Sequence, residues 1–98
     1  ATVTGDSIPP MLDAASTWSN YLGGILVQGG QGYYQLYDQM YFLAPMGNCS
    51  LEVTEVLING DPVPPMRSAS FVMDTVNGMP YLLGGQGYYE LYDTVIGF

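Results

Sequence analysis

The chain has 98 residues, of which nine are acidic and only one, Arg67, is basic, so its formal net charge at pH 7 is −8. Lys and Arg supply most of the affinity of proteins for nucleic acids and anionic membranes, so this composition argues against both partners. The sequence has no histidine and one cysteine, Cys49, which excludes an intrachain disulfide and the usual zinc sites.

The balance of apolar and charged residues is unusual for a monomer. Hydrophobic residues make up 48% of the chain and charged residues only 10%, whereas a soluble surface normally carries more charge. No apolar run approaches the ~20 residues of a membrane-spanning helix, so we expect no membrane insertion. A domain of this size is marginally stable alone, and oligomerisation is the expected supplement.

One offset of 55 residues organises the whole sequence. Residues 1–43 align with 56–98 without a gap, and 16 of the 43 pairs are identical. A match of this length indicates duplication of a structural unit. We therefore expect one domain, 1–98, with repeat 1 at 1–55 and repeat 2 at 56–98. The second repeat is truncated, because it has no counterpart of the stretch 44–55.

Each repeat begins with a lead strand and a proline-rich connection. The lead strands are predicted at 1–4 and 51–58. The block GDxxPPM follows at 5–11 and 60–66, and its Pro-Pro pair cannot donate ladder hydrogen bonds, which favours an extended connection. Asn59-Gly60 is typical of a two-residue hairpin turn.

The next elements are also interpreted as strands. Residues 68–74 are rich in β-branched and aromatic side chains, which favours a strand there and at the aligned positions 14–19. A short helical turn at Leu12–Ser16 is an alternative in the first repeat.

The decapeptide GGQGYYQLYD at 29–38 returns as GGQGYYELYD at 84–93. An apolar run enters it, at 25–27 or 81–83, and an alternating strand leaves it, so each copy predicts a hairpin around a glycine-rich turn. Glycine accepts the positive φ that tight turns require, and Asp commonly caps turns. The residues expected to shape the turns are Gly29, Gly30, Gly32, Asp38, Gly84, Gly85, Gly87 and Asp93.

Beyond the turn, a period of two residues separates two faces. The face that carries Leu is expected to belong to the core, with Asp38 and Asp93 interrupting it: Tyr34, Leu36, Met40, Phe42, Tyr89, Leu91 and Val95. The opposite face is amphipathic and expected to be exposed, and its residues are candidates for an interface or a ligand site: Tyr33, Gln35, Tyr37, Tyr41, Tyr88, Glu90 and Tyr92. Together these elements predict an all-β fold, a small sandwich or barrel built from two tandem pseudo-repeats.

Two resemblances are confined to short segments. Residues 79–93, MPYLLGGQGYYELYD, resemble a kelch-type propeller blade, in which an apolar strand ends in Gly-Gly and a later strand carries Tyr-Asp. The interval between the Gly-Gly pair and the Tyr-Asp pair is shorter here than in a kelch blade, and the later tryptophan is missing. Two units also do not close a propeller. Residues 9–16, PPMLDAAS, resemble a segment of small phage head-decoration proteins. Neither segment assigns a role to any residue.

No catalytic chemistry is predicted. General acid–base catalysis most often uses histidine, which is absent. The GGQG turn is followed by a strand and the chain has no lysine, so it is not a phosphate loop. No stretch has the closely spaced oxygen ligands of a calcium loop. We expect a non-enzyme without a metal or a cofactor.

Two functional hypotheses remain open. The first is a structural assembly protein that packs Tyr-rich strand faces against copies of itself or a larger lattice, since tyrosine is frequent at interfaces. It would be a capsid decoration (cement) protein of a virion or a subunit of an extracellular filament. The alternative is a carbohydrate-binding module with two equivalent sites, each with a GGQG turn, an Asp (Asp38 or Asp93) and an exposed Tyr.

Overall fold

The computed structural model of the chain describes residues 2–56, 63–92 and 95–97. Within these ranges every regular element is a β-strand and no helix occurs, so the predicted all-β class is confirmed. The strands are β1 (Thr2–Gly5), β2 (Ala15–Ser19), β3 (Gly24–Gln28), β4 (Met40–Gly47), β5 (Ser50–Val56), β6 (Ser70–Asp74), β7 (Met79–Leu83) and β8 (Val95–Gly97).

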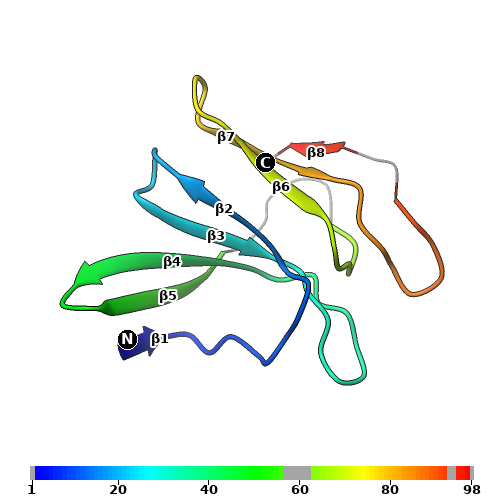
Figure 1. The fold of residues 1–98 in the computed structure, drawn as a ribbon, viewed down its shortest axis with the longest axis horizontal. Coiled ribbons are helices and arrows are strands. Elements are labelled where there is room, and N and C mark those ends of the chain that lie inside the picture. The colour runs from blue at the N-terminus through cyan, green and yellow to red at the C-terminus, as the bar shows by residue number, and fades with distance from the viewer. Residues whose placement is uncertain (1, 57–62, 93–94, 98) are drawn as a thin grey trace.

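The strands form two open sheets (Figure 1). The first has the order β1-β5-β4-β3-β2 and the second the order β6-β7-β8. In the described chain both sheets end in unpaired edge strands, so neither sheet closes into a barrel there, and two packed sheets are compatible with a small sandwich. Strands β2 to β5 form an antiparallel meander, and β1 adds to β5 in parallel.

The described strands test several expectations from the sequence. The strands expected near 14–19 and 68–74 are β2 and β6. The helical turn considered at Leu12–Ser16 does not form, because Leu12 exchanges main-chain hydrogen bonds with Gln31. The segment expected as the second lead strand is β5, which closes the meander on β4. The hairpin expected at Asn59-Gly60 lies outside the described residues.

The two sheets share a strand register at the offset of 55. Ala15 of β2 pairs with Gln28 of β3, and Ser70 of β6 pairs with Leu83 of β7. Gln28 in turn pairs with Met40 of β4, as Leu83 pairs with Val95 of β8. Equivalent residues therefore occupy equivalent positions in β2-β3-β4 and β6-β7-β8.

The hydrophobic core lies between the two sheets. One face of the first sheet contributes Ala15, Leu26 and Met40, and one face of the second contributes Phe71 and Leu82. The connection between the sheets adds Val63 and Met66 to the same cluster. Strands β2 and β6 are in contact, which places the sheets side by side along these strands.

The faces that meet in this core are unlike. Leu26 faces the core, but its counterpart 55 residues later, Tyr81, lies on the outer face of β7 and is 37% exposed. Conversely, Leu82 faces the core and its counterpart Val27 lies on the outer face of β3, because successive side chains in a strand alternate between faces. The face through which each sheet packs is thus equivalent, at the offset of 55, to the face that the other sheet turns outward. We call this packing of unlike faces head to tail.

Two outer faces are left by this arrangement. The tail face is the outer side of β6, β7 and β8, and its apolar side chains are 37–65% exposed: Val72, Met79, Tyr81, Leu83 and Val95. The head face is the outer side of β2, β3 and β4, where Trp18 is 50% exposed and the others are half-buried: Trp18, Ile25, Val27 and Leu43.

The glycines of the decapeptides have the expected backbone conformation. Gly30 and Gly85 have φ of 113° and 109°, and Gly29 and Gly84 are also positive. A Cβ on Gly30 would lie 2.7 Å from Sδ of Met11, and one on Gly85 would lie 2.8 Å from Sδ of Met66. These positions therefore combine a left-handed backbone with close packing, which only glycine tolerates.

We predict that Gly30→Ala and Gly85→Ala each lower the free energy of unfolding by about 1 kcal/mol or more, because alanine resists positive φ and adds an overlapping Cβ. Gly23→Asn is the matched control. Gly23 also has a positive φ, but no atom lies within 4 Å of its Cβ position, and Asn tolerates the left-handed region. Urea denaturation would refute the prediction if Gly30→Ala unfolds at the midpoint of the wild-type chain.

Candidate functional site at the paired GGQG loops

The two decapeptide loops project from the same end of the two sheets (Figure 1). We call residues 29–38 loop 1 and residues 84–92 loop 2. In loop 1 the N–H of Gly32 donates to the carbonyl of Gln35 and the N–H of Tyr37 donates to that of Gly30, at 2.8 and 2.9 Å. Loop 2 has the same two bonds, from Gly87 to Glu90 and from Tyr92 to Gly85.

Each loop packs one tyrosine on its own backbone. The ring of Tyr37 occupies the space where a Cβ on Gly32 would lie, and the ring of Tyr92 does the same at Gly87. Tyr37 and Tyr92 are accordingly half-buried. Gly32 and Gly87 therefore differ in role from the first two glycines of each loop. They make room for a tyrosine ring, whereas the first two glycines allow a positive φ.

The expected alternation of faces fails within the loops. Tyr34 is 98% exposed, Tyr89 is fully exposed, Leu91 is 80% exposed and Val95 is 65% exposed, so the assignment of these four residues to the core is wrong. Residues 33–39 form no strand, and regular alternation begins only at Met40 in β4. Tyr41 was expected on an exposed face but is only 6% exposed, because it lies within β4 between β3 and β5.

The other candidates remain accessible. Tyr33 and Tyr88 are 89% and 57% exposed, and Gln35 and Glu90 are exposed as well. Asp38 acts through its main chain, since its carbonyl accepts a hydrogen bond of 3.0 Å from Nε2 of the buried Gln28. Asp93 lies outside the described residues.

A cleft of about 330 Å³ separates the two loops. Arg67 lies in its wall, and its guanidinium donates from Nη1 to Oδ2 of Asp13 at 3.2 Å and from Nη2 to Oε1 of Gln86 at 2.9 Å. The positive charge is thereby compensated by a carboxylate, and the amide of Gln86 fixes the plane of the guanidinium. The cleft is lined by Gln31, Tyr33, Tyr34, Gln35, Leu36, Arg67, Gln86, Gly87 and Tyr88.

Main-chain hydrogen bonds join loop 1 to the second sheet's connection. Met66, which is 1% exposed, donates its N–H to the carbonyl of Tyr37 and accepts at its own carbonyl from the N–H of Gly30, at 3.2 and 2.9 Å. The N–H of Leu36 donates to the hydroxyl oxygen of Tyr88 at 2.8 Å. Loop 1 is therefore held against residues that lie more than 25 positions later in the chain.

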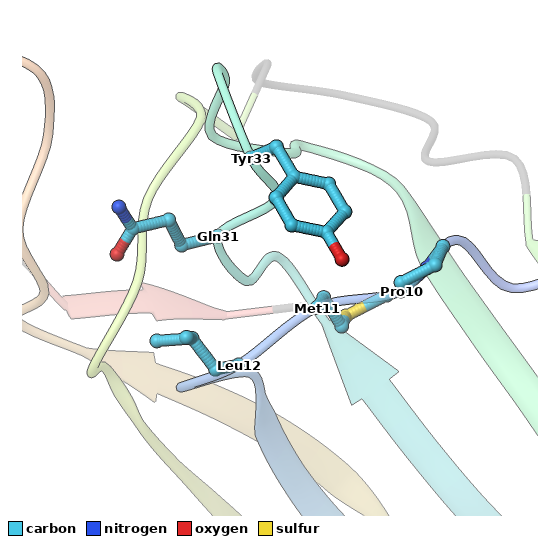
Figure 2. A pocket seen from close by; sticks show the side chains of 6 residues that line it. Pro10, Met11, Leu12, Gln31 and Tyr33 are labelled. Atoms are coloured by element: carbon cyan, nitrogen blue, oxygen red, sulfur yellow. The ribbon is translucent and has the colours of Figure 1, made fainter.

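A second cavity, of about 250 Å³, lies beside loop 1 and shares Gln31 and Tyr33 with the cleft (Figure 2). Tyr33 projects over it toward Pro10 and Met11, while Leu12 and Gln31 line the other side. Three residues of its wall, Pro10, Met11 and Leu12, are the counterparts of Pro65, Met66 and Arg67 at the offset of 55.

Two tyrosines in this region titrate abnormally. Burial raises the pKa of Tyr41, and the negative charges of Glu55 and Asp6 act in the same direction. The pKa of Tyr92 is also raised, first by burial and then by the neighbouring Glu90. Both phenols are therefore held in the protonated form, which suits hydrogen bonding and packing more than proton abstraction.

Among the described residues there is no group of three or more Cys, Asp or Glu side chains arranged to hold a metal ion. No helix long and apolar enough to cross a membrane occurs in the described ranges. No model of a known protein family matches the sequence, and no curated protein matches it either.

Sequence reasoning missed several residues of this site. Arg67, Gln31 and Gln86 were not selected, although Gln31 and Gln86 belong to the repeated decapeptide and Arg67 is the only base. The contact between Met66 and loop 1 had no signal in either repeat alone, because it joins residues of one repeat to residues of the other.

We predict that Tyr88→Phe lowers the free energy of unfolding by about 0.5–1.5 kcal/mol, because it removes the hydroxyl that accepts the Leu36 N–H. Tyr33→Phe is the matched control at the equivalent position of loop 1. No described residue hydrogen-bonds to its hydroxyl. Equal stability losses of the two variants in thermal denaturation would contradict this assignment.

We predict a pH-dependent contribution from Tyr41 on the alkaline side. Its pKa in the folded chain lies above the ordinary value of 10.0, so the contribution is fully present below pH 10 and is lost as the pH rises through the folded pKa. Tyr41→Phe should therefore lose less stability than the wild-type chain between about pH 9 and pH 11 in urea denaturation. Parallel pH profiles for the two proteins would count against it.

Proposed function

We propose that this chain is a non-enzymatic structural module that works by packing its β-sheet faces against other protein surfaces. The observation that carries the proposal is the tail face. Its side chains are contiguous, because Val72 pairs with Tyr81 and Leu83 pairs with Val95 across the strands. A continuous exposed apolar surface on a soluble domain is typical of an interaction site.

The chain itself contains an example of this kind of contact. The residues 55 positions before the tail face lie in β2, β3 and β4, and in that sheet they form the side that β6 to β8 cover. Leu26 and Met40 are 4% and 3% exposed there, whereas Tyr81 and Val95 are 37% and 65% exposed at the equivalent positions. This contrast supports a packing role for the uncovered side.

We further propose that the chain consists of two tandem meander units. Strands β2 to β5 make a four-stranded antiparallel unit, and β6 to β8 follow it in the same register. Four-stranded meanders that pack face to face are the blades of β-propellers, and the period of 55 residues is close to the ~50 residues of kelch repeats. The resemblance of residues 79–93 to a kelch blade agrees with this proposal.

The biological setting is a proposal that rests on composition alone. A capsid decoration protein and a subunit of an extracellular filament both work through contacts repeated many times between folded chains. The low charge and high apolar content of this sequence suit either setting.

Carbohydrate binding is the second candidate, and the cleft between the loops is the observation that favours it. Tyr33 and Tyr88 offer exposed rings for stacking, and Arg67 and Gln86 offer planar polar groups beside them. The geometry favours one cleft flanked by both loops over two separate equivalent sites. A glycan array would support this candidate if binding is lost in Tyr88→Ala and retained in Met46→Ala, whose residue is exposed near the end of strand β4 and does not line the cleft.

We predict that the purified chain self-associates and that added salt strengthens the association. Each chain carries a net charge of −8, so copies repel one another at low ionic strength, and at about 0.15 M salt the screening length falls to ~8 Å. Tyr81→Lys, which puts a charge into the tail face, should shift the chain toward the monomer. Met46→Lys adds the same charge at an exposed position near the end of β4, beside the register shift at Pro45 and Gly47, and should not.

Sedimentation velocity at several protein and salt concentrations measures these states. A wild-type chain that stays monomeric at all of them would overturn self-assembly as the function.

A further inference from the structure

The contacts that join the two sheets have unused counterparts at both ends of the molecule. Within the chain, Gly30 and Tyr37 of loop 1 pair with the main chain of Met66. The residues 55 positions away are Gly85 and Tyr92 of loop 2 at one end and Met11 at the other. In the part of the chain that the structure describes, the Gly85 N–H, the Tyr92 carbonyl and both main-chain groups of Met11 have no hydrogen-bond partner.

Side-chain contacts between the sheets show the same relation. The ring of Tyr21 lies against Gly78, with its Cδ2 atom 3.0 Å from the position of a Cβ. The counterpart of Tyr21 is Val76, and both side chains are largely exposed, at 83% and 89%. The counterpart of Gly78 is Gly23, which has open space around its Cβ position. The second sheet thus presents Val76 without a glycine to pack against. The first sheet presents Gly23 without a side chain packed on it.

Burial follows the same pattern in the loops. Leu36 of loop 1 is half-buried beside the second sheet, whereas the equivalent Leu91 of loop 2 is 80% exposed. Met66 is 1% exposed, whereas the equivalent Met11 is half-buried and lines the open cavity of about 250 Å³. The residues that receive loop 1 are covered, and their counterparts beside loop 1 form a cavity (Figure 2).

We infer that a second copy of this chain docks head to tail. Loop 2 and the tail face of one copy contact the Met11 cavity and the head face of the next, and repeat the contacts that loop 1 and β2 to β4 make with β6 to β8. This arrangement rests on the proposed function. It adds that the partner is a second copy of the chain and that the two copies bind head to tail. Contact between two different surfaces is heterologous, so the copies add in one direction until a ring closes or a filament grows.

The orientation has a direct consequence for oligomer size. If the angle between the two sheets in one chain is repeated between chains, the units turn about a common axis, as propeller blades do. Propellers close with 4–8 blades, so chains of two units each would close with about two to four copies. Gly85 N–H would then pair with Met11 of the next copy, and Leu91 would enter the cavity beside Tyr33.

The test uses one variant for each end of the full chain. Trp18→Lys charges the head face and Leu91→Lys charges the tail, and both positions are at least half exposed in the monomer, so the fold should persist. Each change should weaken self-association at least about 30-fold in Kd, as substitution of a central interface residue does. Val95→Lys is a second tail variant, since Val95 is 65% exposed. Met46→Lys is the control for added charge.

Mixing the variants distinguishes this arrangement from others. Trp18→Lys keeps an intact tail and Leu91→Lys keeps an intact head, so each alone should be monomeric and an equimolar mixture should form a heterodimer and nothing larger. Light scattering coupled to gel filtration measures the masses, and circular dichroism checks the fold of each variant.

Three outcomes would contradict the inference in different ways. Variants that assemble as the wild-type chain does would overturn the head-to-tail contact and leave assembly as the function. A mixture that stays monomeric would show that the two ends do not bind each other. A wild-type chain that is monomeric at every concentration would overturn this inference together with the self-association on which it rests.

Discussion

The pair of main-chain hydrogen bonds between Met66 and loop 1 fixes how the two sheets of this protein meet. Gly30 can donate to Met66 only with the positive φ that its lack of a Cβ permits, and Tyr37 can accept only because loop 1 closes on itself. Because these bonds and the Met66 side chain are buried at the same point, an unpaired polar group there would cost about 1–3 kcal/mol. The sheet packing, the covered loop and the enclosed core all follow from this one contact.

Head-to-tail packing of unlike faces explains a composition that is unusual for a soluble monomer. A sheet whose two faces are both apolar can be covered on both sides only if each unit has a neighbour before it and after it. Within the chain one such contact is made, and the positions equivalent to Leu26 and Leu82 remain on the surface as Tyr81 and Val27. The low fraction of charged residues, 10%, is consistent with sheet faces that pack against other protein surfaces.

Much of the architecture was predictable from the offset of 55 residues, and the failures have a physical reason. The strands at β2 and β6 and the positive φ of Gly30 were predictable, since β-branched residues and glycine carry local signals. Alternation over residues 33–39 misled, because side chains alternate between two faces only where the chain forms a strand, and these residues form none. Loop 1 is instead closed by its own hydrogen bonds, which turn Tyr33 and Tyr34 both outward. The site around Arg67 joins two repeats and has no local signal.

In the proposed head-to-tail arrangement Gly30 and Gly85 are equivalent donors, of which Gly30 is satisfied within the chain and Gly85 only between chains. Amide hydrogen exchange followed residue by residue, at a dilute and at a concentrated sample, tests it most directly. We expect the Gly30 amide to be protected in both samples, whereas the Gly85 amide should exchange rapidly in the dilute sample and become protected in the concentrated one. Equal exchange of Gly85 in the two samples, while the chain demonstrably associates, would contradict it.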